Sequence, residues 1–196
     1  MVTPATINQV SYKEKRSEFI GVLHPLNGPG DVAIQLRSLR KEYHKATHIC
    51  WAYRAYEATG IVENHSDAGE PAGTAGVPIL NVLRKHQLVN GVLYVIRFFG
   101  GIKLGKKGLA RAYETCARLA ITEATLLDFI PRRSISVECP YQYYGEIPRL
   151  VSREKGRVLA VESSELLRWE IELPKANIES FRCNLENVTA GRGRVL

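Results

Sequence analysis

Residues Val92–Phe99 form an almost continuous apolar run that only Arg97 interrupts. Such a run predicts a strand that is covered on both faces. A segment rich in glycine and lysine, Gly100–Gly108, follows it, and the apolar residues of the next segment, Leu109–Ala124, recur with helical spacing. A buried strand, a glycine loop and an amphipathic helix in this order predict a mixed α/β unit in which the helix begins beside the loop.

The residues before this unit predict more elements of the same kind. Strands are expected at Arg16–His24 and Thr47–Tyr56, a helix at Asp31–Tyr43 between them, and a short helix at Pro78–Lys85. We read Glu57–Gly76 as a polar stretch that glycines punctuate.

A second pattern begins near residue 131. From there the sequence predicts strand, helix, strand, strand, helix and a short final strand. This βαββαβ order is the ferredoxin-like arrangement. We therefore expect an α+β protein of two domains, 1–131 and 132–196, of which the second has the ferredoxin-like order.

Positive charge is concentrated in one part of the chain. The net charge is +7, and Arg84–Arg118 contains eight basic residues against the single acidic residue Glu114, so the remainder of the chain is electrically balanced. Such a concentration attracts polyanions, of which nucleic acid is the commonest, although a solvated surface is the simpler alternative. The nucleic-acid contacts that we predict are Arg97, Lys103, Lys106, Lys107, Arg111 and Arg118.

Glycines that precede a helix suit the binding of a phosphate, because free N–H groups and the helix dipole meet there. We predict two such loops; their residues are Gly73, Thr74 and Gly76 in one, and Gly100, Gly101, Gly105 and Gly108 in the other. The second also matches GxxxxGK, but Lys107 stands where a nucleotide-binding P-loop has the Ser or Thr that holds magnesium. We therefore expect this loop to bind the phosphate backbone of a nucleic acid rather than a nucleotide that is hydrolysed. The purely structural alternative is a tight turn with solvated lysines.

One further segment contains groups that acid–base chemistry uses. His65, Ser66, Asp67 and Glu70 lie within six residues, in what we expect to be a loop. Asp67 and Glu70 are candidates either for a divalent metal or for structural roles, as caps of backbone N–H groups or partners of nearby lysines. We favour the structural roles and predict neither a metal nor a cofactor nor a catalytic residue.

Aromatic residues near the basic segment offer surfaces on which bases could stack. These are Trp51, Tyr53, Phe98, Phe99 and Tyr113. Because alternation buries about half the residues of a strand, we expect most of them in the core.

The cysteines and the apolar runs indicate the cellular compartment in which we expect the protein. Cys50, Cys116, Cys139 and Cys183 form no CxxC pair, and no signal-peptide pattern precedes them, so we expect reduced, mostly buried thiols in a cytoplasmic protein. No apolar run has the length of a membrane span.

At this point the sequence resembles the IMPACT family, including its YigZ-like bacterial members. The resemblance is carried by the segments Lys15–Ile20, Ala46–Tyr53, Ser66–Leu80, Arg97–Gly105 and Gly108–Tyr113. Two positions depart from the family pattern. Asp67 is followed by Ala68 where an acidic pair is usual, and Lys107 replaces a glycine.

The resemblance implies a first domain with the βαβ fold of the ribosomal-protein and elongation-factor superfamily and a second domain similar to the last domain of elongation factor G. It also implies a link to translation control, with RNA, the ribosome or a translation-factor protein as partner. Because no apolar run is long enough to span a bilayer, we expect no membrane association. We therefore expect a binding protein that is not an enzyme. Two alternatives stay open: a metal-dependent hydrolase or nucleotide-handling enzyme at His65, Asp67 and Glu70, and a pure protein-interaction module.

Overall fold

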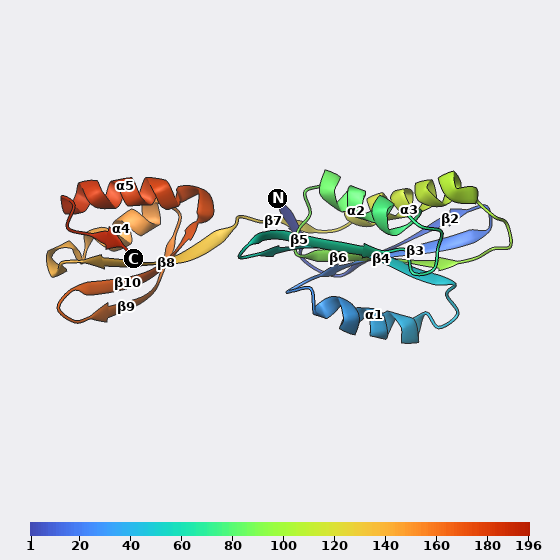
Figure 1. Ribbon diagram of the computed structural model, residues 1–196, viewed down its shortest axis with the longest axis horizontal. Coiled ribbons are helices and arrows are strands. Elements are labelled where there is room, and N and C mark those ends of the chain that lie inside the picture. The colour runs from blue at the N-terminus through green and yellow to red at the C-terminus, as the bar shows by residue number, and fades with distance from the viewer. The chain divides into compact units, whose positions relative to one another are not determined.

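The computed structural model describes all residues from 1 to 196, and the chain divides into two compact units, Met1–Phe129 and Ile130–Leu196. The sequence pattern predicts this boundary two residues later, after residue 131. Both units combine helices with an antiparallel sheet (Figure 1). No helix combines the length and apolar character needed to cross a membrane.

The first unit is built on a five-stranded sheet with the order β2-β3-β6-β4-β5, in which every neighbouring pair is antiparallel. The elements of this unit are β1 (Val2–Pro4), β2 (Asn8–Glu14), β3 (Ser17–Pro25), α1 (Asp31–Glu42), β4 (His48–Glu57), β5 (Gly60–Ser66), α2 (Gly76–Lys85), β6 (Gly91–Phe98), α3 (Gly105–Thr122) and β7 (Leu126–Asp128). The short strands β1 and β7 pair with each other. Strands β3 and β4, which α1 connects, run parallel to each other with β6 between them, so the expected βαβ unit is present in split form.

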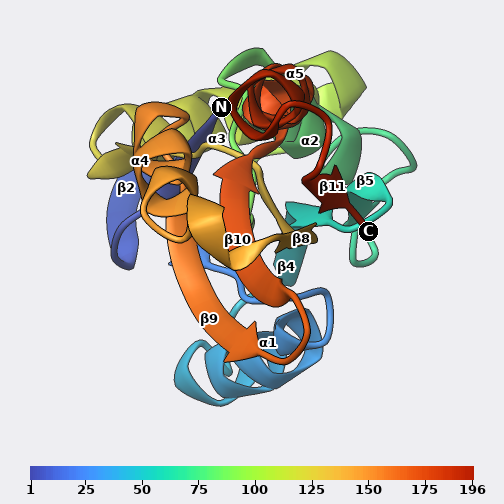
Figure 2. The same ribbon diagram turned by 90° about the vertical axis from the view of Figure 1, so that its left-hand side faces the viewer.

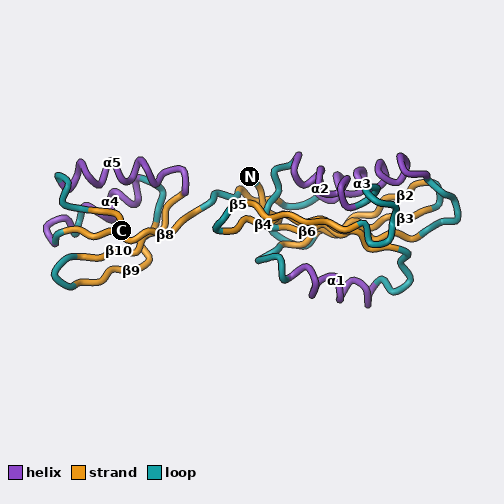
Figure 3. Tube along the Cα trace, viewed as in Figure 1, coloured by secondary structure: helices purple, strands orange, loops and turns teal.

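Helices cover both faces of this sheet. Helix α1 lies on one face, and α2 and α3 lie together on the other (Figure 3). The central strand β6 is therefore buried almost throughout, as its apolar run predicts. Its side chains alternate: Tyr94 and Ile96 pack in the core beside α1, whereas Leu93 and Val95 pack in the core beneath α2 and α3. Arg97 has the same parity as Leu93 and Val95, and this places it on the α2–α3 face.

Three features of the first unit differ from the sequence analysis. Strands β2 and β5 were not predicted, and β5 ends at Ser66, so His65 lies in a strand rather than in a loop. Helix α3 begins at Gly105, four residues before the predicted start, because the glycines and lysines of its first turn conceal the helical pattern. Lys106 and Lys107 are consequently helical residues, and the glycine loop is confined to the residues between β6 and α3.

The second unit has the expected order of elements. It contains β8 (Arg132–Cys139), α4 (Glu146–Arg153), β9 (Arg157–Ser163), β10 (Leu167–Pro174), α5 (Ile178–Thr189) and β11 (Arg194–Val195), with short 3₁₀ turns at Tyr141–Tyr143 and Lys175–Asn177. Its sheet has the order β11-β8-β10-β9. Helices α4 and α5 lie side by side (Figure 2) and form one core with β8 and β10, around Trp169 and Phe181.

All four cysteines are free. Cys50, Cys116 and Cys139 are buried and Cys183 is exposed, as expected for a chain without disulfides.

Candidate anion-binding site at the start of helix α3

Arg97 and Glu70 form an ion pair in the interior of the first unit. The Nη1 atom of Arg97 donates to Oε1 of Glu70 at 2.6 Å, and the two side chains are only 6% and 3% exposed. The hydroxyl of Tyr113 on α3 donates to the same carboxylate oxygen at 2.9 Å. Burial raises the pKa of Tyr113 well above its ordinary value, so the hydroxyl keeps its proton. Through these two contacts, Glu70 connects the loop before α2 to Arg97 on β6 and to Tyr113 on α3.

The guanidinium of Arg97 is also held by two aromatic rings. Its Cζ atom lies 5.6 Å from the ring centroid of Phe19 and 5.4 Å from that of Phe99. This position corrects one prediction: Arg97 is not an exposed phosphate contact, because the strand that carries it is covered on both faces and its charge is neutralised by Glu70.

Asp67 binds the start of α2. Its Oδ2 atom accepts from the N–H of Gly73, and its Oδ1 atom accepts from the N–H groups of Ala75 and Gly76, each at 2.9 Å. Burial works in the opposite direction, but these three hydrogen bonds and the nearby His65 hold the pKa of Asp67 below its ordinary value. Thr74 donates to the carbonyl oxygen of Pro71. The helix start that we predicted around Gly73, Thr74 and Gly76 therefore already contains an anion, and it is the protein's own.

These contacts also occupy the groups that the hydrolase alternative needs. Both oxygens of Asp67 accept backbone hydrogen bonds, and Glu70 is paired with Arg97. His65 is exposed at the end of β5, and no three side chains of His, Cys, Asp or Glu converge as a metal site would require. Cys50 is no better placed as a nucleophile, because burial raises the pKa of its thiol to about 12.

The start of α3 differs from that of α2. Its N-cap residue, Leu104, provides no side-chain hydrogen bond, and its first turn contains no acidic residue. Lys106 and Lys107 lie in that turn and Lys103 lies directly before it, and all three are exposed. None of them forms an ion pair with a carboxylate. Free N–H groups, the positive end of the helix dipole and unpaired lysines are thus present together.

A pocket of about 470 Å³ lies beside this helix start. The residues in its lining that matter below are His48, Glu70, Arg97, Phe99, Lys103 and Lys106. The Nδ1 atom of His48 lies 2.9 Å from the carbonyl oxygen of Ala68, which can only accept, so Nδ1 carries the proton and Nε2 is left as an acceptor in the neutral ring. The pocket therefore combines cations, an acceptor and an aromatic ring.

The other predicted cations lie on a second side of α3. Arg111 and Arg118, both exposed, line a pocket of about 600 Å³ together with Lys15. Leu104 lines both pockets, so the two basic surfaces are adjacent. Five of the six predicted contacts are thus exposed, four of them around the first two turns of α3 and Arg118 in its fourth turn, and only Arg97 is buried.

Two cations in this region were not predicted. Lys15 and Arg16 are exposed in the turn between β2 and β3. Gly100 allows that turn to approach, because a Cβ atom at this position would lie 1.9 Å from the carbonyl oxygen of Arg16. Gly100 thus serves close packing of the chain rather than a ligand. Only an expectation that β2 and β3 form a hairpin could have placed Lys15 beside the start of α3.

Gly105 is a glycine for a different reason. Its φ of +70° favours glycine where the loop enters α3.

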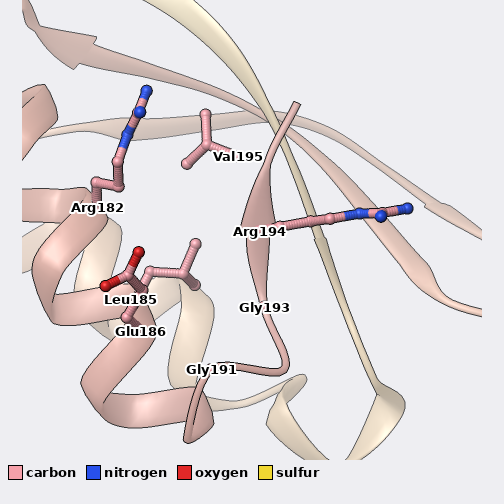
Figure 4. Close-up of a pocket in the computed structure, with 7 residues that line it drawn as sticks. All are labelled: Arg182, Leu185, Glu186, Gly191, Gly193, Arg194 and Val195. Atoms are coloured by element: carbon pink, nitrogen blue, oxygen red, sulfur yellow. The ribbon is translucent and has the colours of Figure 1, made fainter.

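In the second unit, by contrast, four of the five arginines in the strands of the sheet form ion pairs, and only Arg133 does not. Arg168 and Arg194 both contact Glu138, at 3.2 Å and 2.8 Å, and Arg157 contacts Glu172 at 2.9 Å. A pocket of about 350 Å³ lies between α5 and β11, where Arg182 and Glu186 project from the helix (Figure 4). Figure 4 shows the side chain of Arg194 pointing away from that helix. The cations of this sheet are therefore mostly neutralised by carboxylates, whereas the lysines at the start of α3 are not.

Comparisons with known proteins give a consistent assignment. Residues 15–121 match the family described as the Impact N-terminal domain. The chain is 30% identical over 179 residues to an IMPACT family member from Haemophilus influenzae, covering 91% of this chain and 87% of that protein. It is 29% identical to IMPACT family member YigZ from Escherichia coli over 98% of this chain and 95% of the relative. A solved structure described only as that of a hypothetical protein matches with a TM-score of 0.68 and 28% identity, over 100% of this chain and 95% of the other. The chain belongs to the IMPACT family.

Proposed function

We propose that this protein is a translation-associated regulatory protein that binds RNA, free or within a ribosomal particle, through the exposed cations around the start of α3. The observation that carries the proposal is the group of unpaired lysines at a helix start that has no internal anion. An RNA phosphate placed there would receive N–H hydrogen bonds and would meet positive charge from several sides.

The distribution of positive charge indicates that the ligand is a polymer rather than a small anion. Lys103 and Lys106 line one pocket, and Arg111 and Arg118 line the adjacent one. Lys103, Lys106 and Arg111 lie close to the start of α3, and Arg118 lies two turns beyond Arg111 on the same helix, so a strand that follows α3 can place successive phosphates on these groups. The link to translation comes from the family resemblance, as does the assignment of the first unit to the ribosomal-protein and elongation-factor superfamily. The cytoplasmic location, which we also propose, is supported by the free and mostly buried cysteines.

The proposal is tested by reversing the charge of Lys103, Lys106 and Lys107 to Glu and measuring RNA retention on filters at low salt. We expect retention to be lost. For the single substitutions, the slope of log affinity against log salt should fall by about 0.7 to 0.9 for each phosphate contact that is lost.

A matched control is available on α1, which lies on the opposite face of the sheet. Arg37, Arg40 and Lys41 are exposed there, and their replacement by Glu changes the net charge by the same amount. We expect this variant to retain most of its RNA affinity. Equal loss in both variants would show that only the net charge matters, and unchanged retention in the α3 variant would refute the proposal.

A protein partner is distinguished from RNA by nuclease. A ribosomal or translation-factor protein recovered with this chain should be released by nuclease treatment if RNA forms the contact. Recovery that survives the nuclease but is lost in the α3 variant would instead assign the same cations to a direct protein interface.

A further inference from the structure

We infer that the pocket between Phe99 and the start of α3 receives one unpaired nucleotide, so that the protein recognises RNA as a single strand. This inference rests on the proposed function and adds to it the form of RNA that binds. It depends on the pocket and on an exposed aromatic ring, neither of which is needed to hold phosphates alone.

Phe99 is the exposed member of the five aromatic residues that we considered for stacking. Tyr53 and Tyr113 are buried, and Trp51 and Phe98 pack against the core beside α1, whereas Phe99 is 46% exposed. One face of this ring contacts Arg97, but nearly half of the residue is open to solvent among unpaired cations, so burial alone does not explain an aromatic side chain here. The arrangement matches the usual composition of single-strand sites, in which cations track the backbone and aromatic rings stack on bases of any sequence.

Arg97 fixes this ring in place. Its guanidinium lies over one face of Phe99, and the ion pair with Glu70 holds the guanidinium itself. The ring is therefore supported from the interior, and its exposed surface is available for a base. A ring that is already ordered loses little conformational freedom on binding, which favours affinity.

Polar groups line the same pocket as the ring. His48 lines it with Nε2 as an acceptor, and Lys103 and Lys106 line it as donors. The side chain of Arg97, 94% buried, lines it as well, and its Nε atom has no hydrogen-bond partner. A buried donor without a partner is unusual in a folded protein, and an acceptor on a bound base would satisfy it if the Arg97 side chain turned toward the pocket.

The size of the pocket agrees with one nucleotide. A volume of about 470 Å³ lies within the range of sites that enclose a small ligand. A base pair in a duplex cannot enter it, because its bases are stacked above and below and their edges are paired. The phosphates on either side of the inserted nucleotide would lie over Lys103 and Lys106, next to the free N–H groups of α3.

The test compares a fluorescently labelled oligouridine with an RNA duplex of the same length, by fluorescence anisotropy at low salt. In Phe99→Ala the affinity for the single strand should fall about ten-fold or more, as for the loss of a stacked base. The affinity for the duplex should change less than two-fold, and the salt slope should stay the same. Phe99→Leu, which keeps an apolar side chain without a π-face, should behave like Phe99→Ala, whereas Phe99→Trp should bind at least as tightly as the wild type.

Ile102→Ala provides the control, because Ile102 is 41% exposed in the same loop but is not aromatic. It should leave both affinities unchanged. If the wild type binds the single strand and the Phe99 variants bind it equally well, or lose duplex affinity to the same degree, the inference is wrong while the proposed function stands. If the wild type binds neither RNA, both fail.

Discussion

The first unit contains two helix starts that the sequence predicts as anion sites, those of α2 and α3, and only one of them is satisfied internally. At α2 the carboxylate of Asp67 accepts hydrogen bonds from the N–H groups of Gly73, Ala75 and Gly76. At α3 there is no side-chain cap from Leu104 and no acidic residue in the first turn, and lysines surround the opening. Both segments looked like anion sites in the sequence. The structure shows that the protein itself provides the anion for one and not for the other.

This difference assigns the start of α2 to the stability of the fold and the start of α3 to the binding of a ligand. A helix start that is capped from within contributes to folding, and its loss should be measured as a loss of folding free energy. A start that is left open and surrounded by like charges is less stable than it could be, as is common at binding sites. The four predictions below use this distinction, from the largest expected effect to the smallest.

The largest effect is expected from Arg97→Met. This change leaves the Glu70 carboxylate buried without its partner, which typically costs about 3–5 kcal/mol of folding free energy. Urea denaturation measures the loss. In the double variant Arg97→Met with Glu70→Gln the loss should be smaller than in Arg97→Met alone, since no charge then remains buried. Additive losses in the double variant would show that the two side chains do not interact.

Asp67→Ala should destabilise the first unit by about 1–3 kcal/mol, because three N–H groups at the start of α2 lose their acceptor. Asp67→Asn keeps one acceptor oxygen and should lose less. RNA affinity should be retained in both variants under conditions in which they are folded. An RNA affinity that depends on Asp67 more than on Lys103 would reverse the roles of the two helix starts.

Asp67 should also make the folding stability of the protein depend on pH. The pKa of Asp67 is lower in the folded than in the unfolded protein, so its contribution to stability is fully present above the unfolded pKa of about 4. The contribution is lost as the pH falls through the lower, folded value. Stability measured at a series of pH values from 6 downward should therefore decline less steeply in Asp67→Asn than in the wild type. Parallel curves would contradict the assignment.

The smallest effect on stability is expected from Lys106→Glu, and it has the opposite sign. An acidic residue in the first turn of α3 interacts favourably with the helix dipole and should stabilise the protein by about 0.3–1 kcal/mol. The same substitution should weaken RNA binding. Lys106→Gln should lie between the two in both measurements. If Lys106→Glu lowers stability, the start of α3 is not the open, positively polarised end that we describe.

The alternation of strand residues accounts for what the sequence predicted well and for one error. The apolar run around Val95 correctly indicated a strand that is covered on both faces. The same interpretation requires that Arg97, within that strand, is also covered, yet charge alone placed it at the surface. A buried arginine needs a carboxylate partner. Glu70 was available as that partner, because its segment was already expected to contain carboxylates with structural roles.

Other features depended on contacts between distant segments. Asp67 was expected to have a structural role of this kind, but its particular partners follow from the path of a loop that periodicity does not describe. Strands β2 and β5 lie at the edges of the sheet, where exposed polar residues weaken the apolar pattern. Lys15 joins the basic surface only because the turn that carries it packs against Gly100. No local signal in the sequence indicates that approach.

The contrast between the two helix starts is tested most directly by nuclear magnetic resonance, with backbone N–H chemical shifts followed during titration with a short single-stranded RNA. We expect the largest shifts at Gly105, Lys106, Lys107 and Gly108, at the start of α3, and only small changes at Gly73, Ala75 and Gly76, whose N–H groups are bonded to Asp67. RNA that binds without shifting the N–H groups of α3, or that shifts those of α2 as strongly, would contradict the account.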